Sequence, residues 1–284
     1  MRSFSAALLA GLVVPFALSA PVDDKILTPR GYRPKGNTHP IPAGGRIAHV
    51  ADAVHLIAAD GTVVHVASNA KPATKTQETA PEATGWVAYA SWLNTDSSPI
   101  SSFSTTWTVP PEPETWNDQT VFLFNSIEPS TGDAIMQPVL QYGPSAAGGG
   151  QFWAVASWYL YQDNTYFTTP IQVDVGQELD GLITLVAQDG SAYNYNCEFT
   201  NIAGTALVID GSEELTWATE TLEAYSVTEP SDYPAGSTVF SGINLSLLDG
   251  TPSVSWTTVD DTADGLSTTV NVDGATDAEI TITY

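Results

Sequence analysis

The chain has 284 residues, a formal net charge of −24 and one cysteine, Cys197. All Lys, Arg and His residues lie before residue 76, whereas 28 of the 32 acidic residues lie after it. This distribution excludes nucleic acid and anionic membranes as partners, because both are held mainly by Lys and Arg. It also excludes a Ser-His-Asp triad, a Cys-His dyad, a Schiff-base lysine and a histidine metal site from residues 76–284.

The first 20 residues, "MRSFSAALLAGLVVPFALSA", predict a cleaved signal peptide. Arg2 precedes an apolar run that ends in small residues, which is the pattern of an export signal. No later segment is apolar for long enough to be a membrane helix. We therefore expect a secreted, extracellular monomer without cofactor or metal, and without a membrane partner.

Residues 21–80 form a basic region and a linker. Between residues 21 and 75, seven Lys and Arg residues stand against four Asp residues. "AVHLIAADGTVVHVA", residues 53–67, alternates on both sides of Asp60-Gly61 and predicts a β-hairpin. "SNAKPATKTQETAPEATG", residues 68–85, is typical of a cleavable or flexible linker. We predict a pro-region held on the acidic domain by charge, as in a zymogen; the alternative is an N-terminal subdomain that stays attached.

Residues 81–284 consist of short alternating runs separated by Gly, Pro, Asn and Asp clusters. They begin with "GWVAYASW" at residues 85–92 and end with "EITITY" at residues 279–284. Roughly fourteen predicted strands without a helical period favour an all-β fold. The prediction is a two-sheet antiparallel β-sandwich of the concanavalin A-like or jelly-roll type.

Two glutamates lie three residues apart in the predicted strand at residues 214–227, "ELTWATETLEAYSV". Alternation places Leu215, Trp217 and Tyr225 on one face, which we predict to be the core, together with Glu223. Glu220 then points to the opposite side, among small or apolar neighbours that raise a carboxyl pKa by desolvation. Read alone, a glutamate in this position is more often a solvated strand residue than a catalyst.

Two glutamines share a face of the predicted strand "AIMQPVLQYG", residues 134–143. Alternation puts Gln137 and Gln141 on the same side. A glutamine NH₂ group can stabilise a developing oxyanion without carrying charge, which suits a segment devoid of Lys and Arg. A polar row on a solvated sheet face is the alternative for both residues.

These strands resemble the fungal glutamic peptidases called eqolisins. "VLQYGPSAAGGGQFWAVASWY", residues 139–159, is similar to the family segment that runs from Ile-Leu-Gln-x-Gly to a Trp-Tyr pair. "TWATE", residues 216–220, resembles the end of the Ala-Glu-Trp-x-x-Glu motif. "SFSTTWTVPPEP" and "GWVAYASW" resemble the early strands of the mature domain, so the resemblance covers about residues 85–284. "FLFNSIEPSTG" replaces the family's Trp-Val-Gly-Ile-Asp-Gly block.

The resemblance implies an acid endopeptidase and assigns residues to roles. Gln141 falls on the catalytic glutamine and Glu220 on the catalytic glutamate, which selects Glu220 over Glu223. Trp158, Tyr159 and Gln137 are expected to line the substrate cleft. The implied partners are protein or peptide substrates and the protein's own pro-segment. We expect the heads of Glu220 and Gln141 to open onto one cleft and share a water molecule.

Three other interpretations stay open on the sequence. A lectin-like sandwich could hydrolyse glycans with two carboxylates about 5 to 10 Å apart. A carbohydrate-binding sandwich would expose some of the eight tryptophans as stacking platforms. A catalytically silent relative of the peptidases would bind peptides without cleaving them.

Overall fold

The computed structural model describes residues 24–68 and 85–284. The predicted signal peptide, most of the linker and the predicted boundary near residue 80 lie outside these residues. Within the described ranges no helix is long and apolar enough to cross a membrane. Two short 3₁₀ helices are present, η1 (Lys35–Asn37) and η2 (Pro230–Asp232).

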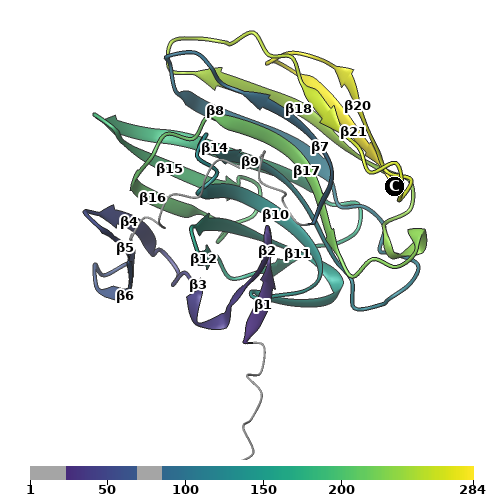
Figure 1. Cartoon of the computed structure of the whole chain (residues 1–284), viewed down its shortest axis with the longest axis horizontal. Coiled ribbons are helices and arrows are strands. Elements are labelled where there is room, and N and C mark those ends of the chain that lie inside the picture. Colours follow the sequence, from purple (N-terminus) through teal and green to yellow (C-terminus); the bar gives the residue numbers. More distant parts are fainter. Residues whose placement is uncertain (1–23, 69–84) are drawn as a thin grey trace, which may run out of the picture.

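Two large curved sheets pack face to face as a sandwich (Figure 1). The strands of the first sheet are β3 (Thr38–Pro40), β7 (Trp86–Leu93), β9 (Thr120–Glu128), β10 (Ala134–Ser145), β11 (Gly148–Tyr161), β12 (Asn164–Phe167), β13 (Ile171–Gln172), β17 (Trp217–Tyr225) and β19 (Thr257–Val259). Its strand order is β19-β7-β17-β9-β10-β11-β12-β3, with β13 beside β11.

The second sheet has the order β20-β21-β18-β8-β14-β15-β16-β4-β5-β6. Its strands are β4 (Arg46–Val50), β5 (Ala53–Ile57), β6 (Val63–Ser68), β8 (Ile100–Thr108), β14 (Glu178–Asp189), β15 (Ala192–Phe199), β16 (Leu207–Ser212), β18 (Ser237–Leu247), β20 (Ser267–Val272) and β21 (Ala278–Thr283). The predicted all-β sandwich and the hairpin around Asp60-Gly61, now β5 and β6, are confirmed.

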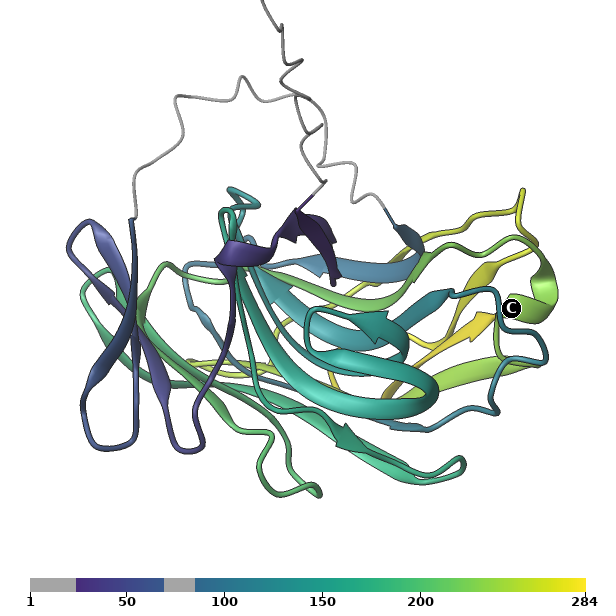
Figure 2. The same ribbon diagram turned by 90° about the horizontal axis from the view of Figure 1, so that it is seen from below.

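The basic N-terminal region is built into both sheets. Strand β3 pairs with β12 and strand β4 pairs with β16, each in parallel orientation. Strands β1 (Lys25–Thr28) and β2 (Gly31–Pro34) form a separate hairpin. Figures 1 and 2 show this β1–β2 hairpin lying over the face of the first sheet that is turned away from the second.

Both faces of the first sheet are therefore buried. The inter-sheet face packs residues such as Leu123, Leu140 and Leu222 against Phe103 and Trp107 of the second sheet. The opposite face, called here the outer face, carries a second apolar cluster formed by Phe122, Phe124, Ile135, Val139, Ala156, Trp158, Leu160 and Phe167, with Leu27 of the β1–β2 hairpin. Because neighbouring residues of a strand alternate between faces, these two clusters fix the direction of every side chain in β9, β10 and β17.

Candidate active site

Gln141 and Glu223 lie in one row across three strands of the first sheet. Gln141 of β10 is directly opposite Phe122 of β9, and Phe122 is directly opposite Glu223 of β17. Residues directly opposite each other in neighbouring strands point to the same face. Two strand spacings of about 4.8 Å separate their backbones by roughly 10 Å. An amide and a carboxyl thus flank Phe122 on the outer face.

Glu220 lies on the inter-sheet face, opposite to Gln141. Its Oε1 accepts a hydrogen bond from Thr105 of β8 in the second sheet, and the side chain is completely buried. Burial raises its pKa well above the usual range. The prediction that Glu220 and Gln141 open onto one cleft is wrong, because residue 220 is an odd number of positions from residue 223 and points the other way. The prediction had taken the face of Leu215, Trp217 and Tyr225 to be the core.

The side-chain amide of Gln141 is held by the turn between β10 and β11. Its Nε2 donates to the carbonyl oxygens of Gly143 at 2.6 Å and Gly148 at 2.9 Å. Its Oε1 accepts from the hydroxyl of Ser145 at 2.8 Å. A register shift between Tyr142 and Gly143 brings these carbonyls to the side chain. The amide plane is therefore fixed before any ligand binds.

Glu223 is completely buried beneath the β1–β2 hairpin. Its Oε1 accepts hydrogen bonds from the backbone N–H of Arg30 and the hydroxyl of Tyr225, both at 2.5 Å. Desolvation raises the pKa of Glu223 to about 8, although these two donors and the charge of Arg30 act in the opposite direction. The other oxygen, Oε2, has no partner of acceptable hydrogen-bond geometry among the described residues, although the nearby Trp86 indole also acts to lower the pKa of Glu223.

Arg30, at the tip of the β1–β2 hairpin, also pairs with a second buried carboxylate on the outer face. Its Nη2 lies 3.1 Å from Oε2 of Glu128, whose side chain is 1% exposed. Its Nη1 donates to the carbonyl of Ala134 at 3.3 Å. Desolvation raises the pKa of Glu128 to about 7, against the lowering effect of the Arg30 charge. One N-terminal residue therefore contacts both carboxyl groups of the outer face.

Gln137 and Trp158 also lie on the outer face, directly opposite each other in β10 and β11. Both are fully buried, and within the described ranges neither the Gln137 amide nor the Trp158 indole N–H has a hydrogen-bond partner. Tyr159 points to the inter-sheet face instead, where its hydroxyl lies 2.9 Å from Nε2 of His49. The predicted pairing of Trp158 and Tyr159 in one cleft is therefore wrong, because adjacent strand residues face opposite ways.

The sequence interpretation missed Glu128 and rejected Glu223. The sequence does contain a signal for Glu128. Its position differs from those of Phe122 and Phe124 by even numbers, so the three side chains lie on the same face of the strand. The signal for Glu223 was weaker, since its face could not be identified without the pairing of β17 with β9.

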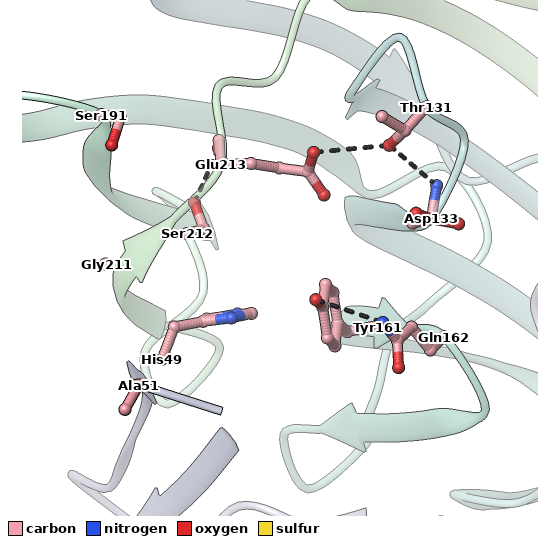
Figure 3. Close-up of a pocket in the computed structure, with 10 residues that line it drawn as sticks. All are labelled: His49, Ala51, Thr131, Asp133, Tyr161, Gln162, Ser191, Gly211, Ser212 and Glu213. Carbon is pink, nitrogen blue, oxygen red and sulfur yellow. Dashed lines mark hydrogen bonds between the residues drawn. The ribbon is translucent and has the colours of Figure 1, made fainter. Parts of the chain in front are cut away.

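A polar pocket of about 380 Å³ lies elsewhere, where β4 meets the ends of β11 and β16 (Figure 3). The rings of His49 and Tyr161 lie nearly perpendicular to each other, with their centroids 4.7 Å apart, and Thr131 donates to Glu213 at 3.4 Å across the opening. None of the residues predicted for catalysis or substrate binding lines this pocket. Among the described residues, no cluster of three or more His, Cys, Asp and Glu side chains is placed to hold a metal ion.

No protein-family model and no curated protein matches the chain. Among solved structures, scytalido-glutamic peptidase with a peptide-based transition state analog matches with a TM-score of 0.47 and 14% identity, over 71% of this chain and 98% of that chain. SCP-B, a member of the eqolisin family of peptidases in complex with the tripeptide Ala-Ile-His, matches with a TM-score of 0.45, 14% identity and the same coverage. The similarity is to the family that the sequence motifs resemble.

Proposed function

We propose that the protein is a secreted acid endopeptidase of the glutamic type that uses Glu223 and Gln141, rather than Glu220 and Gln141. The observation that carries this proposal is the row Gln141, Phe122 and Glu223 on the outer face. It puts a carboxyl and an amide donor on one surface of a segment that has no Lys, Arg or His. The sequence resemblance supplies the reaction class, and the row corrects the choice of glutamate.

In this mechanism one carboxyl group serves as base and then as acid. Ionised Glu223 takes a proton from a water molecule, whose oxygen forms a bond to the peptide carbonyl carbon. A side-chain amide donor stabilises the oxyanion that results. The carbon–nitrogen bond then breaks, and protonated Glu223 returns its proton to the leaving amine. Water is consumed and the carboxylate is regenerated.

Gln141 is the oxyanion donor in this scheme because it shares the row of Glu223. Its two amide hydrogens are directed to the carbonyls of Gly143 and Gly148, so one of these bonds must open when substrate binds. Gln137 and Trp158 supply further donors on the same face, and neither donor has a partner within residues 24–68 and 85–284. We assign them to the binding of substrate carbonyl groups.

The β1–β2 hairpin accounts for latency in the same proposal. It covers Glu223 with the backbone of Arg30, and burial raises the pKa of the carboxyl group to about 8, so that the base is protonated at acid pH. Three ion pairs join the basic region to the acidic segment, Arg30 to Glu128, Arg33 to Asp163 and Arg46 to Asp210. Release of this pro-segment would expose the carboxyl group to water and lower its pKa.

The test is proteolysis of a denatured protein substrate near pH 3 to 4 by acid-treated protein. Cleavage should resist pepstatin-type inhibitors, which target paired aspartates. Polysaccharide hydrolysis or tight glycan binding without proteolysis would favour the lectin-like alternatives. Against the carbohydrate-binding alternative, none of the eight tryptophans, all within the described ranges, is among the exposed large hydrophobic residues.

A further inference from the structure

Glu128 has a buried carboxylate whose cation is supplied by the N-terminal region. The Arg30 guanidinium lies 3.1 Å from it and is itself only 11% exposed. Residues 76–284 contain no Lys, Arg or His, so the acidic segment has no cation of its own for this position. A buried carboxylate without a partner is costly, which makes the position selective for a positive charge from another source.

The position of Arg30 also indicates where a substrate cation bound at Glu128 would lie relative to the scissile bond. Its backbone nitrogen is 2.5 Å from Oε1 of Glu223, while its side chain ends at Glu128. In the proposed mechanism Glu223 protonates the nitrogen of the scissile bond. A substrate residue whose nitrogen meets Glu223 would place its side chain as Arg30 does.

The surface between the two glutamates is suited to hold such a residue. Gln137, fully buried on the same face, lies toward the end of β10 that contains Ala134, the residue whose carbonyl accepts from Arg30. Neither amide atom of Gln137 has a partner among the described residues. An amide whose donor and acceptor atoms have no partner among the described residues therefore lies on the same face, three residues along β10 from the carbonyl that binds the guanidinium.

We infer that Glu128 forms the base of a specificity subsite that accepts Arg or Lys immediately after the scissile bond. Arg30 of the N-terminal region occupies this subsite, but the backbone around Arg30 has a conformation unsuited to cleavage. Arg30 adopts a positive φ of 73°, and the preceding carbonyl of Pro29 accepts from the Thr28 hydroxyl at 3.1 Å. An extended substrate would present the same side chain without this turn. The inference rests on the proposed peptidase function.

The experiment compares two peptides that differ only in having Arg or its neutral isostere citrulline after the cleaved bond, with the site of cleavage located by mass spectrometry. Release of the β1–β2 hairpin by acid treatment exposes Glu128 to water and removes the desolvation that raises its pKa to about 7, so the carboxyl group can ionise at pH 5. Under these conditions kcat/KM should be at least tenfold higher for the Arg peptide, which corresponds to about 1.4 kcal/mol. The ratio should fall to about 1 in Glu128→Gln. The control Glu178→Gln removes an exposed carboxylate from β14 and should keep the wild-type ratio.

The outcomes separate this inference from the proposed function. Cleavage with equal kcat/KM for both peptides, or an Arg preference that survives Glu128→Gln, would overturn the subsite and leave the peptidase proposal in place. If neither peptide is cleaved, the proposed function fails, and equilibrium binding of the same peptides is measured by fluorescence anisotropy. Tighter binding of the Arg peptide that is lost in Glu128→Gln would then support the subsite, whereas equal binding would refute it.

Discussion

Gln141 and Glu223 lie on either side of Phe122, in a row that crosses three strands of the first sheet. Glu220, three residues before Glu223, accepts a hydrogen bond from Thr105 of the other sheet. The two glutamates of one strand therefore have different surroundings. One faces the outer surface that the N-terminal region covers, and the other is part of the core between the sheets.

The first prediction separates these glutamates. Glu223→Gln should lower kcat by at least about 100-fold, because a neutral amide can neither accept nor return the proton. Glu220→Gln should stay within a few-fold of wild type, since the new amide oxygen can still accept from Thr105. Proteolysis is measured on acid-treated protein, with thermal unfolding as the check on folding. Full activity of Glu223→Gln, or its loss only in Glu220→Gln, would contradict the corrected assignment.

The second prediction concerns the oxyanion. Gln141→Ala removes the amide donor nearest to Glu223 in the row and should reduce kcat by about 10² to 10³, the usual effect of losing one such donor. The change should appear in kcat more than in KM, because the interaction strengthens in the transition state. Gln172→Ala, an exposed glutamine in β13, is the matched control. A fall confined to KM would assign Gln141 to substrate binding instead.

Most strands could be predicted from the sequence because period-two alternation is a local property. Gln137 and Gln141 are predicted on one face for the same reason, since both lie at the same phase of one strand, whereas Trp158 is assigned to the cleft by the family resemblance. The relation of Gln141 to Glu223 could not be predicted, because it depends on which residues of β9 stand opposite both.

The choice of Glu220 failed for a packing reason. The small or apolar neighbours of Glu220 in its strand, Ala218, Leu222 and Ala224, pack in the inter-sheet core with Phe103 and Trp107. The outer face looked like the core because it is apolar as well, and it is buried by the β1–β2 hairpin rather than by the second sheet. Alternation identifies two faces of a strand but cannot say what covers each one.

The third prediction tests the contact between Arg30 and the two glutamates. Arg30→Met keeps an apolar side chain but leaves the buried Glu128 without its cation. Removing one partner of a buried ion pair costs roughly 3–5 kcal/mol when the other partner stays charged, and we expect this cost to fall on the docked state of the β1–β2 hairpin. Amide hydrogen exchange at pH 8 should therefore accelerate at least about 100-fold in residues 24–34. Arg46→Met breaks a half-exposed pair with Asp210, worth at most about 1 kcal/mol, and should change exchange little. Equal effects of the two substitutions would show that Arg30 has no special role.

The fourth prediction is that acid weakens the docking of the N-terminal region through two histidines. Burial lowers the pKa of His49, packed against Tyr159, and of His39, stacked on His65, to about 4 in each case. The docked state therefore binds fewer protons than the released state, whose histidines titrate near 6.5. Their contribution to docking is complete above pH 6.5 and is lost as the pH falls from 6.5 through 4.

The glutamates cannot cause this release. The pKa of Glu128 is raised to about 7 and that of Glu223 to about 8, so their contribution to docking is complete below about pH 4.5 and is lost as the pH rises through 7 to 8. Between about pH 4.5 and 6.5 the histidines and the glutamates therefore act in opposite directions, and the histidine contribution is isolated by comparing wild type with a variant that lacks both imidazoles. Hydrogen exchange of residues 24–68, corrected for the intrinsic rate at each pH, measures this profile. In His39→Gln/His49→Gln the acid limb should move to lower pH, and an unchanged acid limb would show that other groups control release.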